Sequence, residues 1–251
     1  MPDLMTRREL LLTTAFALFT GRVNASNALL DSQSQQLNSY PDAAINWNKC
    51  RSQMAALAKA NASGLISQQT VAAQGRMYLT QLDIESAEFK HAVDAAYESG
   101  NQYWLWQRLI KDSNINGGIL SINNDQPVPL HDHPGASGML RIISGETEVW
   151  QFDEINSGNN SREKNGGDQD IVELELAMHR VLKPGDVALL TPEQGNIHAL
   201  RALTAQCSML DFFIPPYERS QRSWYKPLTN NWFDKEKVAC RKFPQAEFPR
   251  A

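Results

Sequence analysis

Two histidines, His131 and His133, are separated by a single residue near the middle of the chain. On an extended strand alternate side chains point to the same face, so these two imidazoles can reach one metal ion together. A third histidine, His198, lies 65 residues further on and can join them only if its strand is a spatial neighbour. Histidine is the commonest metal ligand. We therefore predict a β fold that gathers His131, His133 and His198 around one metal ion; the plainer interpretation is a hydrogen-bonded pair of histidines on a strand surface.

Short apolar runs separated by turns surround both histidine segments. Met139–Ile143 and Thr147–Phe152 are predicted strands joined by a turn at Gly145. Val187–Leu190 is another predicted strand, with proline and glycine in the turns on both sides of it. These strands frame the histidines on either side, as the predicted metal site requires.

Residues 127–216 resemble the two sequence halves of the cupin family. Gly185, Pro192, Gly195 and His198 stand where the second half of a cupin has its characteristic residues. The resemblance implies a jelly-roll barrel. The fold class that we predict is therefore mainly β, a cupin jelly-roll barrel with an N-terminal α-helical extension.

Three separated segments resemble a narrower group within the cupins: Pro129–Gly135, Gly195–His198 and Leu210–Tyr217. Many cupins place a carboxylate ligand four or five residues after the second histidine, but Ser137 and Gly138 occupy those positions here. The site would then consist of three neutral imidazoles. In this order the three segments resemble the thiol dioxygenase family that includes cysteamine dioxygenase and the plant cysteine oxidases.

The resemblance implies that His131, His133 and His198 bind Fe(II) and that the product is a sulfinic acid. It also implies that Asp211 and Tyr217 line the substrate pocket as catalytic residues; the alternative is that Asp211 caps a turn and Tyr217 packs after the two prolines. The implied substrates are O2 and an amino-thiol, either cysteamine or a peptide with an N-terminal cysteine.

The chain departs from this family at one position. Some members carry a cysteine two residues before a tyrosine, where a thioether can form, but Ser223 and Tyr225 occupy these positions here, so that crosslink is not available. No arginine matches a carboxylate clamp, which favours an amino-thiol over free cysteine. Arg141 and Arg201 lie in predicted strands, however, and either could face inward.

The region before the barrel has a helical pattern up to about Lys111. Apolar residues recur there at spacings of three and four: Trp47, Cys50, Met54, Leu57, Phe89, Val93 and Tyr97. Gly64 and Gly100 divide the pattern into separate helices. We predict that residues 26–111 form a helical region packed on the barrel and that residues 112–251 form the cupin domain.

His179 lies in a predicted strand and is interpreted as an ordinary strand residue.

The first 25 residues resemble an export signal. Arg7 and Arg8 precede a mildly apolar run over Leu10–Phe19, and Val23–Ala25 has the small residues of a cleavage site. The paired arginines resemble the bacterial twin-arginine signal, and the apolar run is too short for a lasting membrane anchor. We expect a periplasmic protein without a stable anchor; the alternative is a cytoplasmic protein with an uncleaved N-terminus.

Composition excludes several other classes. The formal net charge of -4 provides no basic surface for nucleic acid. Cys50, Cys207 and Cys240 are an odd number without a close pair, which argues against a disulfide scaffold or a zinc ribbon and leaves one disulfide as the alternative in an oxidising compartment. A chain of 251 residues is long enough for one sizeable core, and we expect a monomer.

Three functions remain for this sequence. The leading one is an Fe(II)-dependent dioxygenase that adds both atoms of O2 to the sulfur of an amino-thiol. A second is a cupin isomerase or another dioxygenase that uses Zn, Mn or Ni on the same histidines. The third is an exported cupin that binds another divalent metal or a small molecule without turnover. Fold alone does not decide among them.

Overall fold

The computed structural model describes residues 44–100, 102–103, 105–155 and 170–248. The predicted export signal at residues 1–25 lies outside this range and stays a prediction. Within the described residues, no helix has the length and apolar character needed to cross a membrane.

Three helices open the described chain: α2 (Trp47–Ala62), α3 (Gln68–Gln81) and α4 (Ala87–Glu98). Each begins after a residue whose side-chain oxygen accepts a backbone N–H three positions on, which satisfies one of the unpaired donors of the first turn. These capping residues are Asn46, Ser67 and Ser86. Gly64 and Gly100 follow α2 and α4 with φ angles of 73° and 66°, as expected of glycines that end helices.

The predicted helical region extends too far. Helix α4 ends at Glu98, and Trp106–Lys111 forms strand β2, which pairs antiparallel with β3 (Asn116–Asn123). Trp106 lies opposite Leu120 in this pairing. A short apolar run fits a helix or a strand equally well, and here the pairing with β3 decides.

The strands form two antiparallel sheets in the described part of the chain. The first has the order β1-β2-β3-β10-β5-β8, and the second closes on itself in the order β11-β12-β7-β6-β9-β4. The remaining strands of the first sheet are β1 (Gln102–Tyr103), β5 (Ser137–Ser144), β8 (Val187–Leu190) and β10 (Gln206–Ile214). The second sheet consists of β4 (Val128–His131), β6 (Thr147–Ile155), β7 (Asp170–Leu182), β9 (Ile197–Ala202), β11 (Ser223–Pro227) and β12 (Lys237–Pro244).

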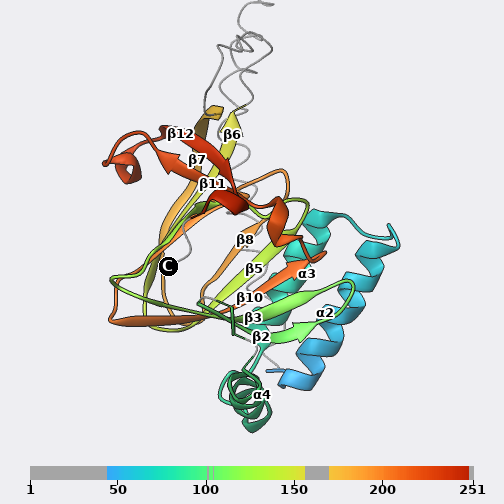
Figure 1. Ribbon diagram of the computed structural model, residues 1–251. Helices are drawn as coiled ribbons and strands as arrows, with labels where there is room; N and C mark the ends of the chain where they lie inside the picture. Colours follow the sequence, from blue (N-terminus) through green and yellow to red (C-terminus); the bar gives the residue numbers. More distant parts are fainter. Residues whose placement is uncertain (1–43, 101, 104, 156–169, 249–251) are drawn as a thin grey trace, which may run out of the picture. The chain divides into compact units, whose positions relative to one another are not determined.

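This architecture confirms the predicted fold class, a mainly β jelly-roll barrel preceded by helices (Figure 1). The strand predicted at Val187–Leu190 has the same bounds as β8, and the strands predicted on either side of Gly145 lie within β5 and β6. Gly145 itself turns between them with a φ of 75°.

The helices pack on the first sheet. Helix α3 contacts β5 and β8, and α4 contacts β2 (Figure 1). The four apolar residues that the sequence predicts on one face of α2 are all buried. One of them, Trp47, meets Phe89 of α4 and Phe212 of β10, with ring centroids 5.5 and 6.4 Å apart. On α4 the predicted apolar face is only partly buried, because Tyr97 is 46% exposed. The helices therefore complete a core on the outside of the barrel.

Candidate metal centre

The sheet register brings the three predicted metal ligands together. His131 at the end of β4 lies directly opposite His198 of β9, and His133 follows two residues after His131. The centroids of the three rings are 4.6 to 4.9 Å apart. One ligand atom from each residue lies within 4.8 Å of the others. Among the described residues this is the one group of three or more histidine, cysteine or acidic side chains that could hold a metal ion.

Burial keeps all three imidazoles neutral. Their exposed fractions are 3% for His131, 1% for His133 and 6% for His198. Loss of solvation lowers the pKa of His131 and His133 well below the usual histidine range and lowers that of His198 to about 3; the positive charge of Arg222 acts in the same direction. Each ring is therefore uncharged at neutral pH and has a nitrogen lone pair available for a metal.

The geometry of the ring nitrogens fits a divalent metal. Nδ1 of His131 donates to the carbonyl oxygen of Pro129 at 2.8 Å, which leaves Nε2 as the atom with the lone pair. This Nε2 lies 3.3 Å from Nε2 of His198. Two nitrogens that each bind one ion at about 2.1 Å are expected roughly 3.0 to 3.4 Å apart. Nδ1 of His133 is buried without a hydrogen-bond partner among the described residues, so the site also contains an unsatisfied ring nitrogen.

Asn196 connects the two histidine segments. Its side-chain oxygen accepts the backbone N–H of His133 at 2.8 Å. The His133 ring in turn stacks on Phe213, with centroids 4.5 Å apart and planes inclined by 21°. Asn196 lies inside the segment that the sequence analysis singles out around His198, but its role depends on a contact across 63 residues and was not predicted.

Asn196→Ala should weaken metal binding by roughly 10- to 100-fold, because contacts that orient metal ligands typically have effects of that size. The substitution leaves the N–H of His133 without its acceptor and frees that residue to move. Competition titration with a chelator measures the affinity. Asn230→Ala, at an exposed position, is the control and should leave it unchanged. Equal affinities in the two variants would mean that Asn196 does not position the site.

A cavity of about 50 Å³ adjoins the three histidines. Asp211 and Tyr217 both line it, as the resemblance implies. The remaining lining residues are Trp106, Asn116, Leu120, Val128, Phe213, Arg219 and Arg222. The structure thus brings all five predicted site residues around one small space, which has room for water-sized molecules.

Asp211 is buried against this cavity, and Tyr217 is half-buried there. Asp211 of β10 is 7% exposed, and burial raises its pKa to about 7 although Arg222 acts in the opposite direction. The Tyr217 ring lies edge-on to that of His133 with centroids 4.8 Å apart, and burial raises the pKa of its hydroxyl. Asp211 does not belong to the group that could hold the metal. It is therefore available for contact with a substrate.

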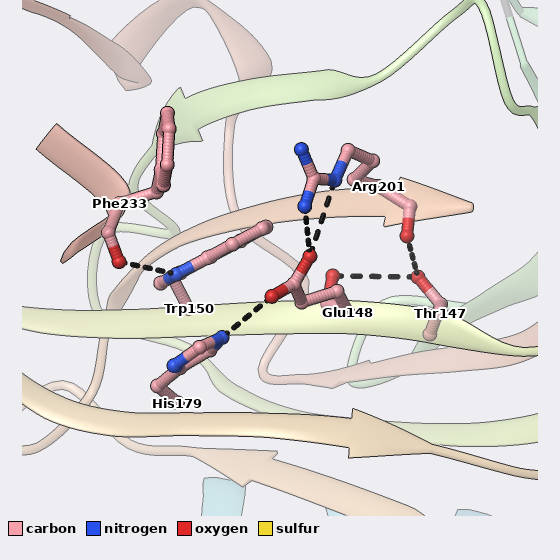
Figure 2. Close-up of polar contacts among 6 residues, drawn as sticks. All are labelled: Thr147, Glu148, Trp150, His179, Arg201 and Phe233. Carbon is pink, nitrogen blue, oxygen red and sulfur yellow. Dashed lines mark hydrogen bonds and ion pairs between the residues drawn. The ribbon is translucent and has the colours of Figure 1, made fainter. Parts of the chain in front are cut away.

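The arginines near the site are not the two that the sequence analysis considers. Arg141 donates to the carbonyl oxygens of Leu79 and Leu82 at the end of α3. Arg201 pairs with Glu148, which also accepts a hydrogen bond from His179 (Figure 2). Neither lines the cavity. The cavity instead has Arg219 and Arg222 in its wall, and no motif in the sequence pointed to them.

The residues at the family's crosslink positions form hydrogen bonds instead. The Tyr225 hydroxyl donates to Oδ2 of Asp132 at 3.0 Å, and the Ser223 N–H donates to Oδ1 of the same carboxylate at 2.7 Å. Asp132 is the residue between the two histidines of the pair. Strand β11 is therefore tied to the loop that carries His133 without a covalent bond.

Comparison with known proteins identifies a family and several relatives. The family model PCO_ADO matches residues 76–246. The 2-aminoethanethiol dioxygenase of Mus musculus is 26% identical over 125 residues, covering 45% of this chain and 49% of that protein. Plant cysteine oxidase 1 of Arabidopsis thaliana is 29% identical over 105 residues, covering 40% and 32%. The chain therefore spans about half the length or less of these curated relatives.

Solved structures match only in part. A cupin superfamily protein from Desulfitobacterium hafniense is 18% identical with a TM-score of 0.31, covering 44% of this chain and 76% of that one. A double-stranded β-helix protein from Klebsiella pneumoniae is 19% identical, also with a TM-score of 0.31, covering 44% and 75%.

Proposed function

The chain belongs to the PCO_ADO family, and on this basis we propose that it is a thiol dioxygenase acting on a small thiol. The reaction is RSH + O2 → RSO2H, in which both oxygen atoms pass to sulfur and no external reductant is needed. The observation that carries the proposal is the cluster of three buried, neutral imidazoles at the wall of a small cavity. The names of the relatives, 2-aminoethanethiol dioxygenase and plant cysteine oxidase, support it.

His131, His133 and His198 would hold the metal, which we propose is Fe(II). Imidazole binds several divalent metals, and oxygenases commonly use Fe(II) on a face of three protein ligands that leaves other positions open. A bound Fe(II) would supply redox chemistry with O2 and a site for the substrate sulfur as thiolate. Because the described ligand group contains no carboxylate, all three protein ligands of the ion would be neutral.

Asp211 and Tyr217 are proposed to act on the substrate from the other walls of the cavity. The Asp211 carboxylate accepts hydrogen bonds from a substrate amine, and its raised pKa allows it to take or release a proton near neutral pH. The Tyr217 oxygen accepts a hydrogen bond from the Arg222 guanidinium. The phenolic proton is consequently left to be donated to an oxygen atom that is being added to sulfur.

Anaerobic loading of the purified protein with Fe(II), followed by addition of a small thiol and O2, tests this function. We expect O2 uptake in the presence of thiol and a product heavier than the thiol by two oxygen atoms. The Zn(II)-loaded protein is the control and should consume no O2. Metal binding without O2 uptake across cysteamine, cysteine and peptides with an N-terminal cysteine would instead support a binding protein without turnover.

A further inference from the structure

Arg222 occupies a buried position in the cavity wall. It lies between the turn η2 (Arg219–Gln221) and strand β11, and it is only 9% exposed. Its guanidinium lies over the rings of Tyr217 and Trp224, 5.2 and 5.4 Å from the ring centroids. These rings contact His133 and His131, respectively. One aromatic ring therefore separates the positive charge from each of two proposed metal ligands.

This charge has no directly bonded acidic partner in the described part of the chain, although Asp211 and Asp132 lie near enough for Arg222 to lower the pKa of each carboxyl group. Arg222 forms no ion pair there, and its Nε is buried without a hydrogen-bond partner. Its guanidinium does donate to the Tyr217 hydroxyl, but a phenol carries no compensating charge. Burying a cation is costly unless an anion pairs with it. A ligand that brings a negative group to Arg222 would remove this cost.

Other unsatisfied groups gather at the same cavity. Eight buried side-chain nitrogen or oxygen atoms lack a hydrogen-bond partner in the described residues, and four of them belong to residues that line this cavity. These four atoms are Nε1 of Trp106, Oδ1 of Asn116, Nδ1 of His133 and Nε of Arg222. Buried polar atoms in native proteins are normally paired. Nδ1 of His133 belongs to the proposed metal site, and the presence of the other three at one cavity indicates that a polar ligand completes it.

We infer that Arg222 binds a carboxylate carried by the thiol substrate, so that the preferred substrate is a short thiol of the cysteine or mercapto-acid type rather than cysteamine. This inference rests on the proposed function for the identity of the thiol. A guanidinium binds a carboxylate through charge-assisted and often paired hydrogen bonds. The Trp106 N–H is a second unsatisfied donor in the same wall. Arg141 and Arg201 do not provide this contact, because both are engaged elsewhere.

The opposite charge of a cysteine-type substrate also has partners. An ammonium group finds acceptors in the Asp211 carboxylate and the unpaired Oδ1 of Asn116, both of which line the cavity. Sulfur at the metal, carboxylate at Arg222 and amine at Asp211 would then occupy three walls of one small space. Cysteamine would leave Arg222 without an anion, which is the reason that we expect it to bind more weakly.

Anaerobic binding of three thiols to the Fe(II)-loaded protein tests the inference: cysteine, 3-mercaptopropionate and cysteamine. The wild type should bind both carboxylates more tightly than cysteamine. In Arg222→Met the affinity for both carboxylates should fall by roughly 10- to 100-fold, the size expected for a hydrogen bond between charged groups. The affinity for cysteamine should change by less than about threefold. Calorimetric titration of metal-loaded samples with equal iron content measures each value.

Arg201→Met is the matched control, because Arg201 is on the barrel surface and pairs with Glu148. Its selectivity should equal that of the wild type. Equal losses for all three thiols in Arg222→Met would overturn the inference. If Arg222→Met does not fold, the wild-type measurements alone test the inference, because cysteamine binding as tightly as 3-mercaptopropionate would also overturn it.

O2 uptake by the same samples separates this inference from the proposed dioxygenase function. Selective binding without O2 uptake contradicts the dioxygenase function but leaves the role of Arg222 intact.

Discussion

His198→Ala should abolish both metal binding and thiol oxidation. The substitution removes one of three buried nitrogen donors and leaves His131 and His133 unable to hold the ion alone. Changes in the residues that merely orient metal ligands typically reduce affinity or activity by 10- to 100-fold, so loss of a ligand should exceed about 100-fold in turnover. Iron content by elemental analysis and O2 uptake with a thiol measure the two effects.

His179→Ala is the control for this prediction. His179 also lies on a barrel strand, but it is bonded to Glu148 and stacks on Trp150 (Figure 2). It is not among the residues that line the cavity. This variant should keep its iron and its activity. Thermal unfolding of metal-free samples checks that His198→Ala remains folded. A folded His198→Ala protein with full iron content would remove His198 from the metal site.

Gly145→Ala should destabilise the barrel by about 3 kcal/mol. The residue has a φ of 75°, a left-handed conformation that costs an alanine roughly 1 to 2 kcal/mol. An added Cβ would also lie 2.3 Å from the carbonyl oxygen of Gln206 and 2.9 Å from Cα of Cys207. Backbone atoms of a neighbouring strand cannot move away as a flexible side chain can, and overpacking of this kind typically costs 1 to 3 kcal/mol.

Gly185→Ala is the control that separates the cost of the left-handed backbone from the cost of the steric clash. Gly185 has a φ of 95°, but an added Cβ would meet nothing within 4 Å, so only the backbone cost of roughly 1 to 2 kcal/mol applies. Urea unfolding measures both variants. For a protein of this size, 3 kcal/mol corresponds to a fall in the melting temperature of about 6 to 12 °C. Equal destabilisation in the two variants would show that the turn at Gly145 relaxes away from Gln206.

The strands with strong turn signals could be predicted from sequence, and those defined by distant pairing could not. Val187–Leu190 is an apolar run between two glycine-containing turns, and it is a strand with those bounds. Trp106–Lys111 has no such signal, and its apolar residues fit helical spacing as well as a strand. Its state depends on pairing with β3. Likewise, β11 closes the second sheet through a pairing of Trp224 with His131, 93 residues earlier in the chain.

The candidate site was predictable where chemistry follows spacing. His131 and His133 are two residues apart on an extended segment, and His198 directly follows a turn that marks the start of another strand. The structure brings the three residues together as predicted. Asn196 lies two residues before His198 in a polar turn, and its role could not be predicted because it depends on a contact with His133, 63 residues earlier. Arg222 could not be predicted either, because its place in the cavity depends on how η2 leads the chain into β11.

The measurement that tests the metal site most directly is the anomalous diffraction of a crystal of the Fe(II)-loaded protein, recorded at the iron edge. We predict one iron peak between the imidazoles of His131, His133 and His198, about 2.1 Å from a nitrogen of each. An iron peak at any other place, or none at these three rings in a protein that contains stoichiometric iron, would contradict the proposed metal centre and the dioxygenase function that depends on it.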